Sequence, residues 1–297
     1  MGQGIVAVHD PSVRCADTSP ALLGRRMRNE EQPMISPTPN MIAEKAGPVG
    51  RLVFNKPDKR NATSTDMWEA IPVILDDFEK DPAIRVVVVT GAGDKAFVSG
   101  ADISEFEKAR STPEQVAYYD RIGEIANARL AKCAKPTIAR IRGYCVGGGV
   151  GVSLTCDIRI ASDNCTFGVP AARLGLGYRA SGLKTLMDLV GPAYAKEIFF
   201  TARMFNAQEA LGMGLVNRVV PDAELDAFVD DYCRRIAENA PLTIHAAKRT
   251  VEELTRLDGE PDFDRTNALV KECFASEDYI EGRRAFMEKR RPQFKGR

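Results

Sequence analysis

Two glycine-rich segments hold the residues with the clearest potential for chemistry. TGAGDKAFVSGADISEF covers residues 90–106, and RGYCVGGGVGVSL covers residues 142–154. Each segment follows a short apolar run and precedes a helical pattern, so each should present backbone N–H groups at the positive end of a helix. Two such loops in one domain can direct two N–H groups at one oxygen atom. That arrangement stabilises negative charge developing on a carbonyl.

Other ligands for these loops fit the sequence less well. A dinucleotide-binding fingerprint needs G-x-G-x-x-G, but Leu154 occupies the third glycine position after Gly149 and Gly151. A P-loop needs Gly-Lys followed by Ser or Thr, and the sequence has no such tripeptide. A purely structural role, in which the glycines only allow tight turns and close helix packing, stays open.

The elements that must position these loops are strands and helices in alternation. Several short runs predict strands, and RVVVVT has the all-apolar pattern of a strand buried on both faces. Helical patterns lie between the runs, one beginning near Ser64 or Thr65 and another opened by Thr112 and Pro113. This alternation predicts a layered α/β core. The predicted strands are residues 51–54, 85–90, 137–141, 157–162 and 165–169.

The two ends of the chain differ from this core. Residues 1–45 contain five prolines and no hydrophobic period, which predicts a poorly ordered N-terminal extension. A targeting arm, or a gene start placed too early with Met34 or Met41 as the true first residue, are the alternatives. Residues 46–221 are predicted to form the core. Residues 222–297 are predicted to be helical, because amphipathic patterns fill them, and a helical tail of this kind is often an assembly element.

Composition narrows the classes of partner and location. Lys and Arg together number 41, as do Asp and Glu, so the net charge of zero argues against nucleic acid and membrane surfaces as partners. No apolar run approaches the ~18 residues of a transmembrane helix. Seven cysteines without a CxxC pair favour a reduced, cytoplasmic setting. The two histidines, His9 and His245, argue against a histidine triad or a histidine-rich metal site.

Longer motifs around the loops resemble the enoyl-CoA hydratase/isomerase (crotonase) superfamily. They are NKPDKRNA, FVSGADISEF, GYCVGGGVGVSLTCDIRIAS, FGVPAARLGL and AQEALGMGLVNRVV, in this order from about Val49 toward the C-terminus. The resemblance implies a crotonase-like spiral of ββα units with a helical C-terminal trimerisation region. It also implies a homotrimer or a dimer of trimers. The implied ligand or substrate is an acyl-CoA thioester, with no prosthetic group and no metal.

The resemblance further implies roles for individual residues. By motif position, the N–H groups of Ala101 and Gly148 correspond to the pair that holds the thioester oxygen in the family. The first turn and the SGAD loop hold CoA in a bent form there, and C-terminal residues help to cover it. Carried onto this sequence, the binding set is Asp58, Arg60, Ala62, Lys95, Ser99, Ala101, Asp102, Ile103, Val146, Gly148, Pro170, Phe286 and Lys289.

The sequence departs from the family pattern where the hydratases carry two catalytic glutamates. Gly151 and Ala171 occupy those two positions. A general acid or base contributes about 10²–10⁴ to a rate, so its loss matters. Asp120 and Glu124, on the helix that borders the acyl pocket in the family, are candidate substitutes. Other polar side chains near these positions are Tyr118, Tyr119, Arg173, Tyr178 and Arg179.

Several functions therefore stay open. One is a hydratase-like or isomerase-like enzyme with relocated acid and base groups. Another is a family enzyme of different chemistry, such as decarboxylation or thioester hydrolysis. A protein that binds acyl-CoA without catalysis is the third, and a scaffold without any ligand is the fourth. Intact FVSGAD and GGG motifs argue against the scaffold.

Three further side chains are expected to be structural. Asp157 stands at a strand start, where it should hold backbone. His245 lies on the stripe of a C-terminal helix, and Cys145 should be a small buried residue beside the glycines rather than a nucleophile.

Overall fold

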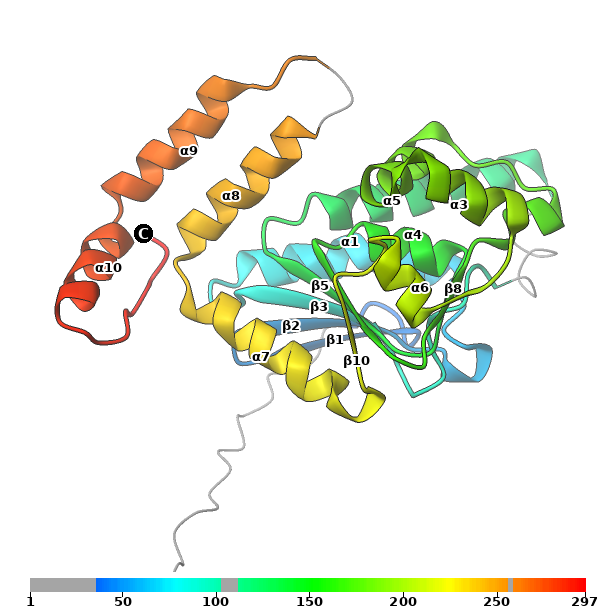
Figure 1. Ribbon diagram of the computed structural model, residues 1–297, viewed down its shortest axis with the longest axis horizontal. Helices are drawn as coiled ribbons and strands as arrows, with labels where there is room; N and C mark the ends of the chain where they lie inside the picture. The colour runs from blue at the N-terminus through cyan, green and yellow to red at the C-terminus, as the bar shows by residue number, and fades with distance from the viewer. Residues whose placement is uncertain (1–35, 103–111, 256–258) are drawn as a thin grey trace, which may run out of the picture. The chain divides into compact units, whose positions relative to one another are not determined.

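Two sheets form the core of the protein, in a computed structural model that describes residues 36–102, 112–255 and 259–297. The larger sheet has the order β1-β2-β3-β5-β7-β10, in which only the β1–β2 pair is antiparallel. Figure 1 shows helices α1, α3, α4 and α5 together on one side of it, and α7 on the other. The strands of this sheet are Met41–Ala46, Val49–Phe54, Val86–Gly91, Thr137–Ile141, Ile158–Ser162 and Arg218–Val220.

The smaller sheet has the order β4-β6-β8-β9. Strands β4, β6 and β8 are parallel, and β8 pairs with β9 in the antiparallel direction. The chain passes from β3 to β4, from β5 to β6 and from β7 to β8, so each turn contributes one strand to each sheet before a helix follows. This repetition confirms the predicted spiral of ββα units. The strands are Ala96–Val98, Tyr144–Val146, Thr166–Gly168 and Phe205–Asn206.

Strand β3 shows why the larger sheet is buried on both faces. All six of its residues are buried, as its run of four valines predicts. Side chains alternate along a strand, so Val87 and Val89 point into the main core, while Val86 and Val88 pack against α7 (Leu225–Glu238). The sheet therefore separates two hydrophobic layers.

The helices on the main-core side carry the segments that border the two glycine loops. α1 packs against α3, and both predicted helix starts are confirmed, with Ser64 and Thr112 as the N-cap residues. The predicted helical start at residues 101–109 falls largely outside the described residues. These helices are α1 (Thr65–Lys80), α3 (Pro113–Ala131), α4 (Gly148–Leu154), α5 (Ala180–Thr201) and α6 (Ala207–Gly212).

The first strand begins earlier than the sequence analysis predicts. β1 starts at Met41, inside the range 1–45 that was expected to be an extension. MIAEKA has only two buried side chains, Met41 and Ala43, and its charged residues hide the period-two pattern. Pairing with β2 therefore creates this strand, and the core begins before residue 46.

The C-terminal region is helical in its described part, as predicted. α7 lies on the sheet, and Figure 1 shows α8, α9 and α10 extending away from it. α9 packs against both α8 and α10. These last helices are α8 (Pro241–Leu254), α9 (Phe263–Ala275) and α10 (Glu277–Met287).

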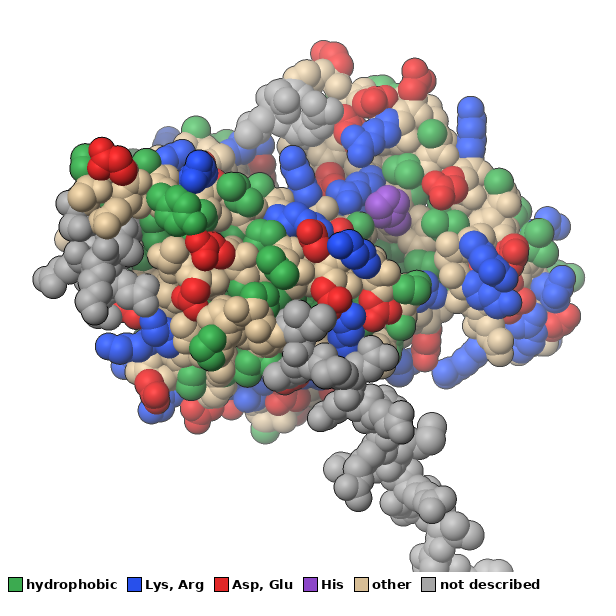
Figure 2. Space-filling model, turned by 180° about the vertical axis from the view of Figure 1, so that it is seen from behind, with side chains coloured by type: hydrophobic (Ala, Val, Ile, Leu, Met, Phe, Trp, Pro, Cys, Tyr) green, Lys and Arg blue, Asp and Glu red, His purple; other side chains and the backbone are tan. Residues whose placement is uncertain are grey.

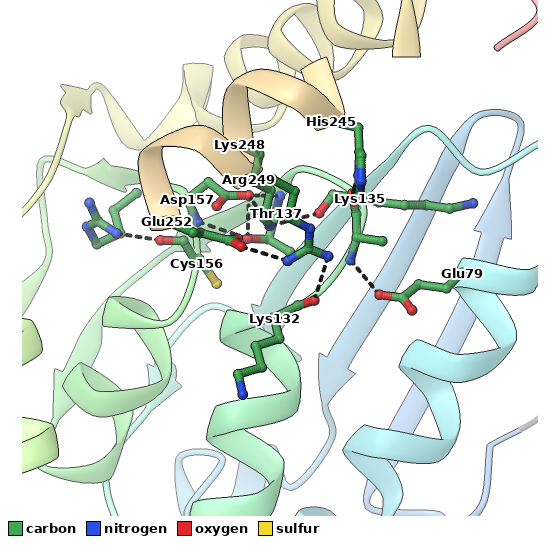
Figure 3. Close-up of polar contacts among 12 residues, drawn as sticks. Glu79, Lys132, Lys135, Thr137, Cys156, Asp157, His245, Lys248, Arg249 and Glu252 are labelled. Carbon is green, nitrogen blue, oxygen red and sulfur yellow. Dashed lines mark hydrogen bonds and ion pairs between the residues drawn. The ribbon is translucent and has the colours of Figure 1, made fainter. Parts of the chain in front are cut away.

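One face of α8 attaches this region to the core, and we call its residues His245, Lys248 and Arg249 the α8 anchor (Figure 3). Their side chains meet the backbone carbonyls of Ala134, Lys135 and Lys132, at 3.4, 3.1 and 3.1 Å respectively. Lys248 also forms an ion pair of 2.8 Å with Asp157. Asp157 in turn accepts a hydrogen bond of 2.7 Å from the N–H of Thr137. Asp157 and His245 thus have the structural roles expected of them.

The charged surface is mixed. Acidic and basic side chains are interspersed over much of the face that Figure 2 shows. Among the helices that the structure describes, none is long and apolar enough to cross a membrane.

Candidate functional site

The two glycine loops lie side by side. Strands β4 and β6 are parallel, with Ala96 opposite Tyr144, so the loops that follow them leave the same edge of the smaller sheet. A Cβ atom placed on Gly148 would lie 3.8 Å from the Cα atom of Gly100. A Cβ atom placed on Gly100 would lie 3.9 Å from the backbone nitrogen of Gly148. The segments that carry Ala101 and Gly148 therefore converge.

Both backbone N–H groups are available to a ligand. Ala101 forms a parallel bridge with Thr63, but the bridge uses the carbonyl of Gly100 and the N–H of Asp102. Gly148 is the first residue of α4, where an N–H has no partner inside its own helix. Within the described ranges, neither N–H has a hydrogen-bond acceptor.

The three consecutive glycines serve different purposes. Gly147 has a φ of +55°, a conformation that side chains disfavour. At Gly149 a Cβ atom would lie 2.0 Å from the carbonyl oxygen of Val98, so only glycine fits. Gly148 meets neither constraint, because its Cβ would make only ordinary contacts. The structural explanation left open by the sequence accounts for Gly147 and Gly149 but not for Gly148.

The turn at residues 57–62 packs against the first glycine loop. The N–H of Ser99 donates to the carbonyl of Arg60 at 3.2 Å, and Lys56 forms an ion pair of 2.8 Å with Asp102. The guanidinium of Arg60 lies 4.7 Å from the ring centre of Tyr144. The structure thus gathers most of the expected CoA residues around one edge of the smaller sheet. They are Asp58, Arg60, Ala62, Ser99, Ala101, Asp102, Val146 and Gly148.

The remaining residues expected to bind CoA are not part of this group at the edge of the smaller sheet. Ile103 lies outside the described residues, and Lys95 is exposed just before β4. Pro170 begins the short helix η3 (Pro170–Leu174) after β8. Phe286 is 82% exposed on α10, and Figure 1 shows α10 far from α4. A single chain therefore does not bring Phe286 and Lys289 to the glycine loops.

The two positions that lack carboxylates differ in their surroundings. A Cβ atom placed on Gly151 would meet nothing within 4 Å. Ala171, in η3, is only 3% exposed. One vacant position is thus open space, and the other is enclosed by its neighbours.

The candidate substitutes on α3 have cationic partners. Arg179 lies 3.6 Å from the carboxylate of Asp120 and also pairs with Glu124. All three side chains are substantially exposed to solvent. The arrangement ties α3 to the segment after η3, and it gives both carboxylates the same cationic partner.

Two further side chains near the loops have distinct environments. Burial raises the pKa of the Cys145 thiol well above its ordinary value, so this cysteine stays protonated, as expected of a residue that is not a nucleophile. Thr63 is buried beside Gly100, and the sequence analysis did not single it out. The only local signal was a hydroxyl residue directly after the NKPDKRNA motif.

Across residues 36–102, 112–255 and 259–297, no group of three or more His, Cys, Asp or Glu side chains could hold a metal ion.

Known proteins resemble the chain over most of its length. A family model described as enoyl-CoA hydratase/isomerase matches residues 44–297. A short-chain-enoyl-CoA hydratase from Clostridium acetobutylicum is 36% identical over 259 residues, which span 87% of this chain and 98% of that protein. A crotonyl-CoA hydratase from Syntrophomonas wolfei is 34% identical, over 86% of this chain and 97% of the other.

Solved structures agree with these sequence matches. An enoyl-CoA hydratase/isomerase family protein from Hyphomonas neptunium superposes with a TM-score of 0.84 at 35% identity, over 88% of this chain and all (100%) of that chain. An enoyl-CoA hydratase/carnitine racemase from Magnetospirillum magneticum gives a TM-score of 0.81 at 35% identity, over 87% and 96% of the two chains.

Proposed function

The chain belongs to the enoyl-CoA hydratase/isomerase family, and we propose that it binds an acyl-CoA thioester and polarises its carbonyl between the N–H groups of Ala101 and Gly148. The observation that carries this proposal is the convergence of the two glycine loops, each with an N–H that has no acceptor among the described residues. An oxyanion site of this kind contributes on the order of 10²–10³ per donor to a rate. The two relatives described above are a short-chain-enoyl-CoA hydratase and a crotonyl-CoA hydratase, and their names support the same ligand class.

The CoA portion binds along the turn at residues 57–62 and the SGAD loop. Backbone hydrogen bonds already hold these two segments together. Arg60, exposed and stacked on Tyr144, is placed to meet phosphate charge.

Proton transfer is the part of the function for which this chain offers fewer candidate groups. Without carboxylates at Gly151 and Ala171, and with Asp120 and Glu124 paired to Arg179, we expect hydration of an enoyl thioester to be slow. The same observations favour a second candidate, in which the site binds acyl-CoA without turnover or runs a family reaction that needs no enzyme carboxylate.

The C-terminal helices are the assembly region in this proposal, as a homotrimer or a dimer of trimers. Large apolar side chains of α9 and α10 are exposed in the single chain, and α8, α9 and α10 border an open, mainly apolar groove of about 1010 Å³. Assembly would also give Phe286 and Lys289 a site to cover, since their own chain does not. Sedimentation velocity should give a mass of three or six chains, and a monomer at micromolar concentration would contradict this part.

A cytoplasmic location completes the proposal. Within the described residues all six cysteines are free, which suits a reducing compartment.

Isothermal titration with butyryl-CoA, a saturated thioester, tests the proposal. The wild-type protein should bind it, and Gly148→Pro should bind it much more weakly, because proline removes the N–H while remaining acceptable at the first position of a helix. Gly148→Ala is the matched control, since it keeps the N–H and its Cβ has room. Absence of binding to the wild type, with circular dichroism showing a folded protein, would refute acyl-CoA binding.

Incubation with crotonyl-CoA distinguishes an enzyme that hydrates enoyl thioesters from a protein that binds acyl-CoA without hydrating it. Loss of the enoyl-thioester absorbance would establish hydration. Clear binding without turnover would favour the candidate without hydratase activity.

A further inference from the structure

The loop that carries Ala101 is held from one side by a single buried residue. The N–H of Thr63 donates to the carbonyl of Gly100 at 2.8 Å, and the carbonyl of Thr63 accepts from the N–H of Asp102 at 3.0 Å. Thr63 is only 1% exposed. These two hydrogen bonds bracket Ala101 and leave its own N–H directed away from Thr63.

The hydroxyl of Thr63 adds a second donor to the same carbonyl. Its Oγ1 lies 3.3 Å from the carbonyl oxygen of Gly100. The hydroxyl of Tyr119, from α3, lies 3.3 Å from that Oγ1 and 3.4 Å from the carbonyl oxygen of Thr63. Each hydroxyl carries one hydrogen. Donation from Thr63 to Gly100 therefore leaves Oγ1 as an acceptor, and the Tyr119 hydrogen is shared between this Oγ1 and the carbonyl oxygen of Thr63. Tyr119 is 7% exposed, so water competes little for these contacts.

The geometry of the peptide bond connects these contacts to the ligand site. The carbonyl of Gly100 and the N–H of Ala101 belong to one planar trans peptide, so they point in opposite directions and turn together. Gly100 has a φ of +102°, which only glycine adopts easily, so the peptide's direction depends on being held. Two hydrogen bonds to the carbonyl fix that direction, and they also polarise the N–H into a stronger donor.

We infer that Thr63 and Tyr119 are positioning residues that aim the Ala101 N–H at the thioester oxygen. This inference rests on the proposed function. The direction of the other donor, the N–H of Gly148, is also fixed by a hydrogen bond to the carbonyl of its own peptide. The carbonyl of Gly147, which shares its peptide, accepts from the N–H of Gly151 at 3.3 Å within the start of α4. One donor is thus set by a helical turn. The other is set by the N–H and the hydroxyl of Thr63, and Tyr119 holds that hydroxyl in turn.

The test measures polarisation directly. Difference infrared or Raman spectra of butyryl-CoA labelled with ¹³C at the thioester carbonyl report the shift of the carbonyl stretch on binding. The wild type should shift it to lower frequency. Thr63→Val, which keeps the shape and removes the hydroxyl, should reduce the shift, while Thr63→Ser should retain most of it. Affinity in Thr63→Val should fall by about 2- to 10-fold, the effect of losing one hydrogen bond.

Tyr119→Phe provides an independent arm, because it leaves Thr63 intact. It should reduce the shift by less than Thr63→Val, with an unchanged circular dichroism spectrum. If Thr63→Val does not fold, the carbonyl shift in Tyr119→Phe alone tests whether these hydroxyls orient the Ala101 N–H.

The outcomes separate the inference from the proposed function. A normal shift in the wild type together with the same shift in folded Thr63→Val and Tyr119→Phe would overturn the inference and leave the oxyanion site standing. Binding without any shift in the wild type would overturn the oxyanion site, and the inference with it.

Discussion

In the proposed site, the half that would polarise the thioester and the half that would transfer protons are built in different ways. The N–H groups of Ala101 and Gly148 come from backbone that parallel strands, buried hydrogen bonds and close glycine contacts hold in place. The other half depends on single side chains, and at Gly151 and Ala171 those side chains are absent without any disturbance of the fold. In the proposed site, the polarising groups therefore belong to the fold itself, whereas an acid or base depends on the residue type at one position.

Gly149→Ala should have the largest effect on stability, because it disrupts the packing of the glycine loop that carries Gly148. The new Cβ would lie 2.0 Å from the carbonyl oxygen of Val98, so backbone must move. We expect a loss of about 3 kcal/mol in the free energy of unfolding, at the upper end for overpacking. Chemical denaturation measures it.

Gly151→Ala is the matched control for that variant, since its Cβ would meet nothing within 4 Å. Its stability should stay the same or rise by about 0.5–1 kcal/mol, the gain of alanine over glycine in a helix. Equal losses in both variants would show that Val98 does not constrain the glycine run.

Gly151→Glu should have the next largest effect, on the rate of hydration of crotonyl-CoA. A Cβ atom at this position would meet nothing within 4 Å, and one general acid or base is worth about 10² or more in rate. Gly151→Gln is the control, because it fills the same space without a base. Equal rates for the two variants would show that the missing carboxylate does not limit the reaction.

Ala171→Glu should cost stability instead. The position is only 3% exposed, and burial of a carboxylate there without a partner should cost about 1–3 kcal/mol. Burial raises the pKa of the introduced carboxyl above its unfolded value, so the loss should be smaller near pH 4 than near pH 8. Thermal melts at the two pH values measure this, and a loss independent of pH would point to steric crowding alone.

Asp120→Asn and Glu124→Gln should have the smallest effect. Exposed ion pairs contribute about 0–1 kcal/mol, and both carboxylates are already paired with Arg179. We expect unchanged affinity for butyryl-CoA and, if crotonyl-CoA is turned over, an unchanged rate. A clear fall in rate in either variant would restore that residue as a substitute acid or base.

Much of the fold could be predicted because its signals are local. The apolar run at residues 85–90 predicts a buried strand, and the caps at Ser64 and Thr112 mark two helix starts that the structure confirms. β1 was missed because its short, charged sequence has little pattern of its own, and only pairing with β2 makes it a strand.

The sequence by itself determined the family, the glycines at positions 147–149 and the absence of glutamate at Gly151 and Ala171, because motif and residue identity are properties of the chain alone. Only the tertiary structure decided that Gly100 lies against Gly148, and that Thr63 forms hydrogen bonds with both Gly100 and Tyr119. It also decided that Arg179 pairs with Asp120 and Glu124. Those contacts join residues far apart in sequence. Strand pairing and helix packing bring them together, and no local pattern records which partners will meet.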